Sequence, residues 1–164
     1  MSALKSLPAS VLFACTSNTV RSPIAAALLG HLHGGAILVD SAGVRAGQPS
    51  GFAAAVMQEI GLDISAHEPK SLTETEDTVF DLVISLSPEA HFRAVELSRR
   101  IGCDLESWDT YDPSLISGSR ETKLEAYRTL RDELVRRIRR RFPVGRIAAP
   151  VSNPHLRLRA VRYK

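Results

Sequence analysis

The sequence predicts an α/β fold, a three-layer sandwich in which helices cover both faces of a four-stranded parallel sheet. Short apolar runs alternate with longer segments of helical periodicity, which is the pattern of strand–helix–strand units. The chain has 164 residues and 44% apolar side chains, so one hydrophobic core can form without a disulfide or a structural metal. We therefore expect one domain over residues 1–142, followed by a basic, proline-containing tail over residues 143–164.

Each predicted strand is an apolar run with the length of a buried strand. The runs lie at residues 10–14, 36–39, 82–86 and 104–108, and the last is the least apolar. Strands joined by right-handed crossovers in this way form a flavodoxin-like sheet, which binds ligands beyond the carboxyl ends of its strands. That edge should therefore hold the polar residues that closely follow the strands: Cys15, Ser41, Ser87 and Asp112.

The first two predicted helices differ in their surroundings. Residues 23–32 are apolar on nearly every side, which predicts a buried helix. In the second helix Phe52, Val56 and Ile60 recur every four residues. Gly61 follows, and glycine is the residue type that commonly ends a helix.

Two longer helices follow the third and fourth strands. Ser87 and Pro88 are typical of an N-cap and a first helical turn, and they predict a helix that runs to about Arg100. The last helix is amphipathic and ends near Phe142, with one apolar face formed by Tyr127, Leu130, Leu134 and Ile138. Its C-terminal arginines, within residues 136–141, favour a solvated helix end, where cations complement the helix dipole.

The net charge of +3 does not describe the domain itself. Residues 143–164 contain five basic residues and no acidic one, which leaves −2 (+3 less +5) on residues 1–142. A nucleic-acid-binding domain displays a basic face with residues that contact bases or phosphates. The nearly neutral domain argues against a DNA- or RNA-binding protein, and the role of the tail stays open between disorder and docking on a neighbour.

The cysteines and the N-terminal sequence indicate the compartment in which the protein is expected to work. Cys15 and Cys103 suit a reducing compartment and show no metal-ligand spacing. The longest apolar run near the N-terminus is too short for a signal peptide or a membrane span. We therefore expect a cytoplasmic protein with no metal, other cofactor or membrane partner, and the oligomeric state stays open. Helix surfaces or the tail should hold the histidines that form no metal or triad pattern: His31, His33, His91 and His155.

The segment from Cys15 to Pro23 predicts an anion-binding site. A cysteine follows the first apolar run, a polar loop comes next, and a helix begins with a proline near its first turn. Unpaired N–H groups of the loop and the helix end then point at one spot, where the helix dipole favours negative charge. Thiols in such places ionise more easily than free cysteine, and the thiolate is the nucleophilic form. Arg21 adds a fork of donors suited to two oxygens of a phosphate-like dianion.

Two further residues of this segment have a predicted local role. Asn18, in the middle of the loop, suits a left-handed backbone conformation, which turns successive N–H groups inward. Ser22 is a candidate N-cap of the helix that follows.

This loop resembles the phosphate-binding loop of the low-molecular-weight protein-tyrosine phosphatases and of their relatives, the thioredoxin-coupled arsenate reductases. Their pattern is cysteine, five residues, arginine and serine. The resemblance covers roughly residues 9–142 in the family's order and implies a sheet of the low-molecular-weight phosphatase type. It includes the segments at residues 40–43 (DSAG), 61–67 (GLDISAH), 81–86 (DLVISL) and 112–113 (DP).

The resemblance implies a covalent mechanism. Cys15 would attack phosphorus and hold the phosphoryl group, while Arg21 would grip its equatorial oxygens, most tightly in the transition state. Ser22 matches the family serine whose hydroxyl stabilises the thiolate. Phosphate binding would also involve the remainder of the loop: Thr16, Ser17, Asn18, Thr19 and Val20.

The resemblance also implies functional residues outside the loop. In the phosphatases a serine and a histidine hold the asparagine that matches Asn18, and here these would be Ser41 and His67. Taken alone, His67 is more often a hydrogen-bonded structural histidine. Asp112, followed by proline, matches the aspartate that protonates the leaving oxygen, and Asp109 is the second choice for this acid.

Four departures from the family pattern bear on loop geometry, redox chemistry and substrate. Ser17 occupies a position where glycine is usual, and Val20 one where the phosphatases have a second cysteine. Residues 44–47 lack the aromatic wall of a phosphotyrosine pocket, and Ser114-Leu115 replace tyrosines of the eukaryotic type. The last two departures weaken the case for phosphotyrosine as the natural substrate.

The leading hypothesis is a cysteine-dependent phosphomonoester hydrolase, a protein-tyrosine or aryl phosphatase acting on a phosphorylated protein or a small aryl phosphate. The first alternative is an arsenate reductase, toward which residues 81–86 and 108–113 lean. Ser87 and Ala94 stand where thioredoxin-coupled members have relay cysteines, so such a reductase would need an external thiol. The second alternative is a non-catalytic phosphate- or phosphopeptide-binding module, which would need neither the nucleophile nor the acid.

Overall fold

The computed structural model of the chain describes residues 7–144, so the predicted tail over residues 143–164 lies almost entirely outside the described residues. The strands form one parallel sheet in the order β2-β1-β3-β4, with bounds β1 Ser10–Cys15, β2 Leu38–Gly43, β3 Leu82–Ser85 and β4 Asp104–Ser107. The connecting helices are α1 Arg21–Leu32, α2 Gly51–Gln58, η1 Leu72–Thr75, α3 Pro88–Ile101, η2 Pro113–Leu115 and α4 Arg120–Arg141, where η marks a 3-10 helix. The predicted four-stranded α/β sandwich is confirmed.

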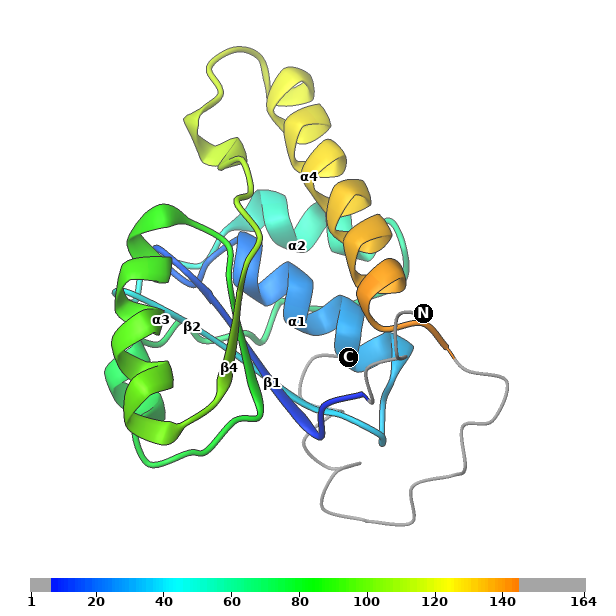
Figure 1. Ribbon diagram of the computed structural model, residues 1–164. Coiled ribbons are helices and arrows are strands. Elements are labelled where there is room, and N and C mark those ends of the chain that lie inside the picture. The colour runs from blue at the N-terminus through cyan, green and yellow to red at the C-terminus, as the bar shows by residue number, and fades with distance from the viewer. Residues whose placement is uncertain (1–6, 145–164) are drawn as a thin grey trace.

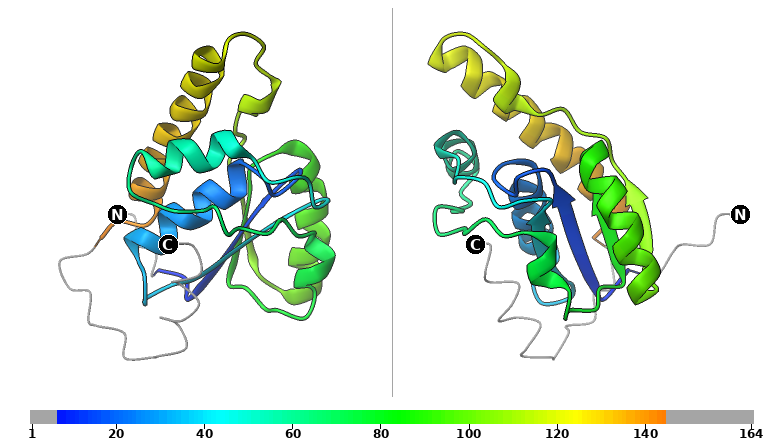
Figure 2. Two further views of the ribbon diagram at one scale, coloured as in Figure 1. Left: turned by 180° about the vertical axis from the view of Figure 1, so that it is seen from behind. Right: turned by 90° about the vertical axis from the view of Figure 1, so that its left-hand side faces the viewer.

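Helices cover both faces of the sheet, as Figures 1 and 2 show. Helices α1, α2 and α4 pack on one face, and α3 packs on the other. Along β1, Val11 and Phe13 belong to the larger core under α1 and α4, whereas Leu12 and Ala14 belong to the smaller core under α3. Because side chains alternate between the two faces, a strand buried on both of them is apolar throughout.

Strand β2 begins later and runs further than the predicted residues 36–39. Its backbone pairs with all of β1, from Ser10 opposite Leu38 to Cys15 opposite Gly43. The ladder continues through the polar residues Asp40 and Ser41 because backbone pairing does not depend on apolar side chains. The apolar run therefore marked only the first part of the strand.

Helix α1 begins at Arg21, two residues before the predicted start. Its N-cap is Val20, which makes no side-chain capping hydrogen bond, so the expectation that Ser22 caps this helix is wrong. Ser22 instead lies in the first turn of α1, where its hydroxyl does not cap the helix and faces the loop. The prediction of a buried helix is confirmed, since residues 21–30 are all buried.

Serine side chains cap the two longer helices, and the cap of α3 by Ser87 is the one that the sequence predicted. Ser87 Oγ accepts a hydrogen bond from Ala90 N at 3.2 Å at the start of α3, and Gly102 ends that helix with a left-handed φ of 69°. Ser119 Oγ accepts from Thr122 N at 3.1 Å at the start of α4, which ends at Arg141 as expected. Helix α2 ends at Gln58, so Ile60 lies beyond it and is exposed.

Two histidines expected on helix surfaces have specific partners. His33 is buried, and its Nε2 lies 2.6 Å from the carbonyl oxygen of Phe142, which joins the end of α1 to the end of α4. His91 Nδ1 lies 2.9 Å from Ser85 Oγ, between α3 and β3. His155 lies outside the described residues.

Within residues 7–144 no helix has the length and apolarity needed to cross a membrane. The same stretch contains no cluster of three or more His, Cys, Asp and Glu side chains that could hold a metal ion.

Candidate active site

The carboxyl ends of the parallel strands bring distant segments together. The register places Ala14 opposite Ala42 on one side and Ser85 on the other, so the loops after β1, β2 and β3 start at the same level. Ser107 lies opposite Ser85, and the segment that continues from β4 crosses the same edge, in the upper part of Figure 1. Of the four residues predicted to share this edge, Cys15 ends β1, Ser41 lies within β2, and Ser87 and Asp112 are the N-caps of α3 and η2.

Cys15 is the last residue of β1 and is only 2% exposed. Its Sγ lies 2.9 Å from Ser22 Oγ and accepts a hydrogen bond from the backbone N–H of Asn18 at 3.3 Å. Both contacts come from the anion-binding segment itself, one from the loop and one from the first turn of α1. An N–H group and a hydroxyl can both donate hydrogen bonds to a thiolate.

Asn18 holds the loop in shape. It has a left-handed backbone, with φ of 56°, as its residue type suggested. Its Nδ2 donates to Ser22 Oγ and to Ser41 Oγ, each at 2.9 Å, and its Oδ1 accepts from Lys70 N at 2.9 Å. His67 Nε2 lies 2.9 Å from the Asn18 carbonyl oxygen. The structure thus brings together the three residues Asn18, Ser41 and His67 that the sequence grouped, and it adds Lys70.

An ion pair fixes the segment that contacts Asn18 through the Lys70 N–H. The Lys70 ammonium pairs with Asp40, and both side chains are mostly buried. Asp40 Oδ1 also accepts from Ser41 N at 2.8 Å, next to the hydroxyl that contacts Asn18. Because the pair joins the β2 strand to the segment before η1, it keeps the Lys70 N–H directed at Asn18.

The backbone of residues 44–47 lies against the anion-binding loop. Val44 N donates to Cys15 O at 3.0 Å, Arg45 N donates to Thr16 O at 3.1 Å, and Gly47 N donates to Ser17 O at 2.9 Å. Val20 packs in the larger core and is 5% exposed, so its backbone rather than its side chain is available to a ligand.

Gly43 permits the close approach of β2 to the loop. A Cβ at this position would lie 2.6 Å from Arg45 O, 2.8 Å from Asn18 N and 2.9 Å from Ser17 C. These neighbours are backbone atoms, which cannot rotate away as a flexible side chain can. A residue without a side chain is therefore required between the strand and the loop.

Arg21 connects the anion-binding loop to the segment after β4. Its side chain is mostly buried, and Nη1 donates to the carbonyl oxygen of Thr110 at 3.0 Å. Nη2 lies 3.4 Å from Thr16 Oγ1 and 3.6 Å from Asp112 Oδ2. Thr16 Oγ1 in turn donates to Ser87 Oγ at 3.0 Å. The guanidinium is thereby held at the loop, with the candidate acid beside it.

Asp112 is the N-cap of η2, and its side chain is 28% exposed. Oδ1 accepts from the backbone N–H of Ser114 at 3.0 Å and from its hydroxyl at 2.7 Å, while Oδ2 is the oxygen nearest Arg21. The carboxylate also influences Tyr127. Burial raises the pKa of the Tyr127 hydroxyl, a hydrogen bond with Ser50 opposes this, and the charge of Asp112 raises it further.

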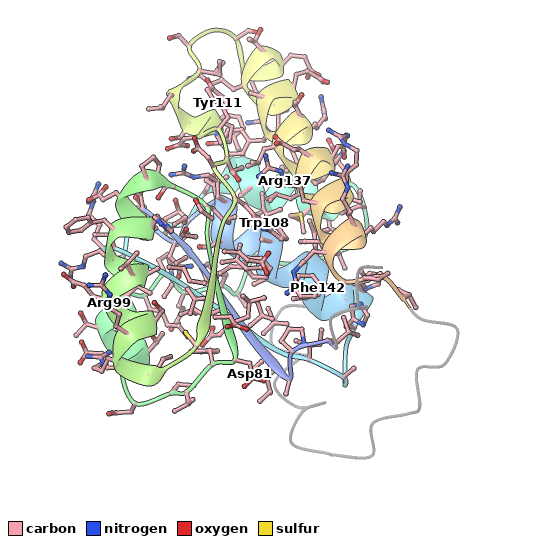
Figure 3. All side chains as sticks on the ribbon, viewed as in Figure 1. Asp81, Arg99, Trp108, Tyr111, Arg137 and Phe142 are labelled. Atoms are coloured by element: carbon pink, nitrogen blue, oxygen red, sulfur yellow. The ribbon has the colours of Figure 1, made fainter. Side chains whose placement is uncertain are left out.

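Asp109, the second choice for the acid, lies in a different place. It lines a groove of about 500 Å³ with Trp108, Arg137, Arg140 and Arg141, between the end of β4 and the C-terminal half of α4. Figure 3 shows Trp108 and Arg137 on this side of the molecule, with Tyr111 further along the segment toward η2. The ion pair with Arg21 is made by Asp112.

Sequence reasoning missed several residues that position the site. Thr110 contributes a backbone carbonyl to Arg21, and any residue type could do so, which leaves no sequence signal. Lys70 lies 52 positions from Asn18 and contacts it through its backbone N–H. Ser87 was recognised as a helix cap, but its contact with Thr16 depends on how β1 and β3 pair. These contacts follow from the fold rather than from local composition.

The second cysteine lies far from the first along the strand direction. Cys103 immediately precedes β4, at the amino end of the sheet, whereas Cys15 is at the carboxyl end of β1. Burial raises the pKa of the Cys103 thiol, and Asp104 and Asp81 add to this. Both cysteines are free, and Cys103 is half-buried.

Comparison with curated proteins shows similarity to arsenate reductases and to a protein-arginine-phosphatase. The chain is 30% identical over 129 residues to a glutaredoxin arsenate reductase of Synechocystis sp., covering 78% of this chain and 92% of the relative. It is also 30% identical over 142 residues to a protein-arginine-phosphatase of Geobacillus stearothermophilus, covering 78% of this chain and 90% of the relative.

Solved structures of the same kind superpose on the fold. The YwlE arginine phosphatase from Geobacillus stearothermophilus is 32% identical, with a TM-score of 0.66 and coverage of 81% of this chain and 90% of that one. The tyrosine phosphatase AmsI of Erwinia amylovora, at 19% identity, a TM-score of 0.67 and coverage of 82% and 91%, shares the fold. The family model described as low molecular weight phosphotyrosine protein phosphatase matches residues 10–142. On this evidence the chain belongs to the low molecular weight phosphotyrosine protein phosphatase family of enzymes.

Proposed function

We propose that this protein is a cysteine-dependent phosphomonoester hydrolase that acts through a phosphocysteine on a phosphorylated protein or a small aryl phosphate. The observation that supports this most strongly is the side-by-side placement of Cys15, Arg21 and Asp112. Cys15 and Arg21 stand at the two ends of the anion-binding loop, and Arg21 Nη2 lies 3.6 Å from Asp112 Oδ2. This arrangement supports the proposed roles of Cys15 as nucleophile, Arg21 as oxyanion donor and Asp112 as acid.

In the first step the Cys15 thiolate attacks phosphorus. The S–P bond forms as the bond to the leaving oxygen breaks, and Asp112 delivers a proton to that oxygen. The loop N–H groups and Arg21 stabilise the charge on the transferring oxygens. Ser22 and the Asn18 N–H stabilise the sulfur when it is anionic.

In the second step water attacks the phosphocysteine. Asp112, now a carboxylate, takes a proton from the water as the new P–O bond forms and the S–P bond breaks. The thiolate and the protonated acid are regenerated with inorganic phosphate as product, so the cycle needs no metal and no external reductant.

Arsenate reduction is the second candidate, and it is favoured by similarity to proteins named as arsenate reductases. Their chemistry requires electrons, and this chain has two cysteines in total, at opposite ends of the strands. Ser87 and Ala94 occupy the positions where the family's thioredoxin-coupled members have relay cysteines. A reductase activity would therefore depend on an external thiol that attacks an arsenylated Cys15.

A substrate panel separates these candidates. Turnover of 4-nitrophenyl phosphate, a phosphotyrosine peptide and phosphoarginine is measured beside arsenate reduction with glutathione or glutaredoxin as donor. Phosphoarginine is included because relatives are named as arginine phosphatases. We expect phosphate release in the absence of thiol donors, and arsenate reduction without phosphate release would refute the hydrolase.

Cys15→Ser is the matched variant for this panel. We expect it to lose hydrolysis by at least about a thousandfold while retaining phosphate binding, because the loop donors and Arg21 remain. Cys103→Ser, at the far end of the sheet, should keep wild-type turnover. Phosphate binding with no turnover of any substrate by the wild type would instead favour a binding module.

A further inference from the structure

Ser114 donates two hydrogen bonds to one oxygen of the Asp112 carboxylate. The backbone N–H lies 3.0 Å from Oδ1 and the hydroxyl lies 2.7 Å from the same atom. The other oxygen, Oδ2, lies 3.6 Å from Arg21 Nη2. The two oxygens of this carboxylate therefore have different surroundings, one facing Ser114 and the other facing the anion-binding loop.

Helix capping accounts for only one of the two bonds. Asp112 is the N-cap of the short η2 helix, and a cap needs one backbone N–H, which Ser114 supplies. The hydroxyl of an exposed serine can be solvated by water at no cost, so η2 does not need it. Capping therefore does not account for the short contact of this hydroxyl with Oδ1.

We propose that Ser114 is a positioning residue for the acid, and this inference rests on the proposed role of Asp112 in phosphoryl transfer. By holding Oδ1, the Ser114 hydroxyl leaves Oδ2 as the oxygen that carries the proton and faces the leaving group. An oxygen that accepts two hydrogen bonds is the poorer place for a proton, since each donor is best matched by a lone pair.

Arg21 explains why such a restraint is needed. A guanidinium binds a carboxylate most strongly when it contacts both oxygens, and Arg21 already lies beside Oδ2. A freely rotating Asp112 side chain could place both oxygens on Arg21, which would occupy the donors meant for phosphate. A further neighbouring group is the Tyr127 hydroxyl on α4, whose pKa is raised by the charge of Asp112.

The proton balance of the two steps involves Oδ2 alone. Oδ2–H gives its proton to the leaving oxygen as S–P forms and P–O breaks, and Oδ2 receives a proton from water as S–P breaks. Ser114 donates to Oδ1 throughout and neither gains nor loses a proton. Its contribution therefore depends on how strongly the leaving oxygen needs protonation.

The test compares Ser114→Ala with Ser114→Thr on two substrates, using kcat/KM because it includes the first chemical step. Ser114→Ala should lose about tenfold on phenyl phosphate and less than about twofold on 4-nitrophenyl phosphate, since a misplaced acid matters most for a basic leaving group. Ser114→Thr keeps the hydroxyl at a solvent-exposed position and should restore wild-type values. In an Asp112→Asn background, Ser114→Ala should have no further effect.

A measurement without turnover separates this inference from the proposed function. Three-bond couplings in NMR spectra report the χ1 populations of Asp112. We expect a single χ1 rotamer in the wild type and in Ser114→Thr, and averaging over several rotamers in Ser114→Ala. If the wild type hydrolyses no phosphate ester, the proposed function fails, and these couplings still decide whether Ser114 orients Asp112. Averaged couplings in the wild type, or an equal loss on both substrates, would overturn the inference.

Discussion

At the scale of single residues, the site depends on a few side chains that each connect several segments of the chain. Asn18 makes hydrogen bonds to the cysteine, to the first turn of α1, to β2 and to the segment before η1. Arg21 in the same way joins the loop to the segment carrying the candidate acid. Substitutions at such residues should therefore change both turnover and local structure, and the two effects can be measured separately.

Asp112→Asn tests the acid. The amide cannot deliver a proton, so the loss in kcat/KM should grow with the basicity of the leaving oxygen. General acids contribute on the order of a hundredfold to ten-thousandfold, and we expect that range for phenyl phosphate and a much smaller loss for 4-nitrophenyl phosphate. Asp109→Asn is the control, because Asp109 lies in the groove with Trp108 and Arg137. A leaving-group-dependent loss in Asp109→Asn but not in Asp112→Asn would transfer the role to Asp109.

Gly43→Ala tests the close approach between β2 and the loop. The new Cβ would meet backbone atoms at 2.6 to 2.9 Å, so either the strand or the loop must shift. We expect a loss of about 1–3 kcal/mol in the free energy of unfolding, typical of overpacking, together with weaker phosphate binding. Urea unfolding and calorimetric titration with phosphate measure the two effects.

Gly51→Ala is the matched control for this change. A Cβ there would meet no atom within 4 Å, and the residue opens α2. Alanine should leave stability unchanged or raise it slightly, because it restricts the unfolded chain. Equal stability of the Gly43→Ala and Gly51→Ala variants would show that β2 and the loop are not in the tight contact described.

At the scale of elements, apolar runs predicted β1, β3 and β4 to within one residue, and only β2 was misplaced. Helix caps predicted α3, and an apolar face predicted α4. The loop pattern pointed to Cys15 and Arg21 because both residues belong to one short segment of the sequence. The contacts of Arg21 with Thr110, 89 positions away, and of Asn18 with Lys70 depend on strand order and loop conformation, which residue types do not reveal.

An acidic residue between α2 and α4 should give stability a specific pH dependence. Hydrogen bonds from Arg128 and then Arg131 lower the pKa of Glu59 from 4.5 to about 2. Because the folded-state pKa is lowered, the stabilisation is present above about pH 4.5 and is lost as the pH falls toward 2. Salt should weaken it, since Glu59 lies at the surface.

Glu59→Gln is the variant that checks this. It should be less stable than the wild type at pH 7, and the gap should close between pH 4.5 and 2, as followed by urea unfolding at each pH. Glu121→Gln is the control, because Glu121 pairs with Arg128 but its side chain is 74% exposed. A gap between the wild type and Glu59→Gln that stays constant across this range would contradict the assignment.

At the scale of the whole molecule, the sheet separates the two thiols. Cys103 precedes β4 at the level where β1 begins, so the two thiols are about five residues apart along the strand direction, or roughly 16 Å at ~3.3 Å per residue. Two strand spacings add to this distance. A disulfide needs Cα atoms within about 7 Å of each other, so Cys15 and Cys103 cannot pair in the folded protein.

Mild oxidation should therefore inactivate the protein without an internal disulfide. A sulfenic acid at Cys15 has Val20 where the phosphatases place a second loop cysteine, and Cys103 is out of reach, so no thiol of the same chain can resolve it. After limited peroxide, mass spectrometry should find Cys15 as a sulfenic acid or higher oxide, and early inactivation should reverse with a small thiol. Cys103→Ser should inactivate at the wild-type rate, because Cys103 does not take part. A Cys15–Cys103 disulfide as the main product would show that the sheet opens on oxidation and would restore the case for a reductase with its own relay.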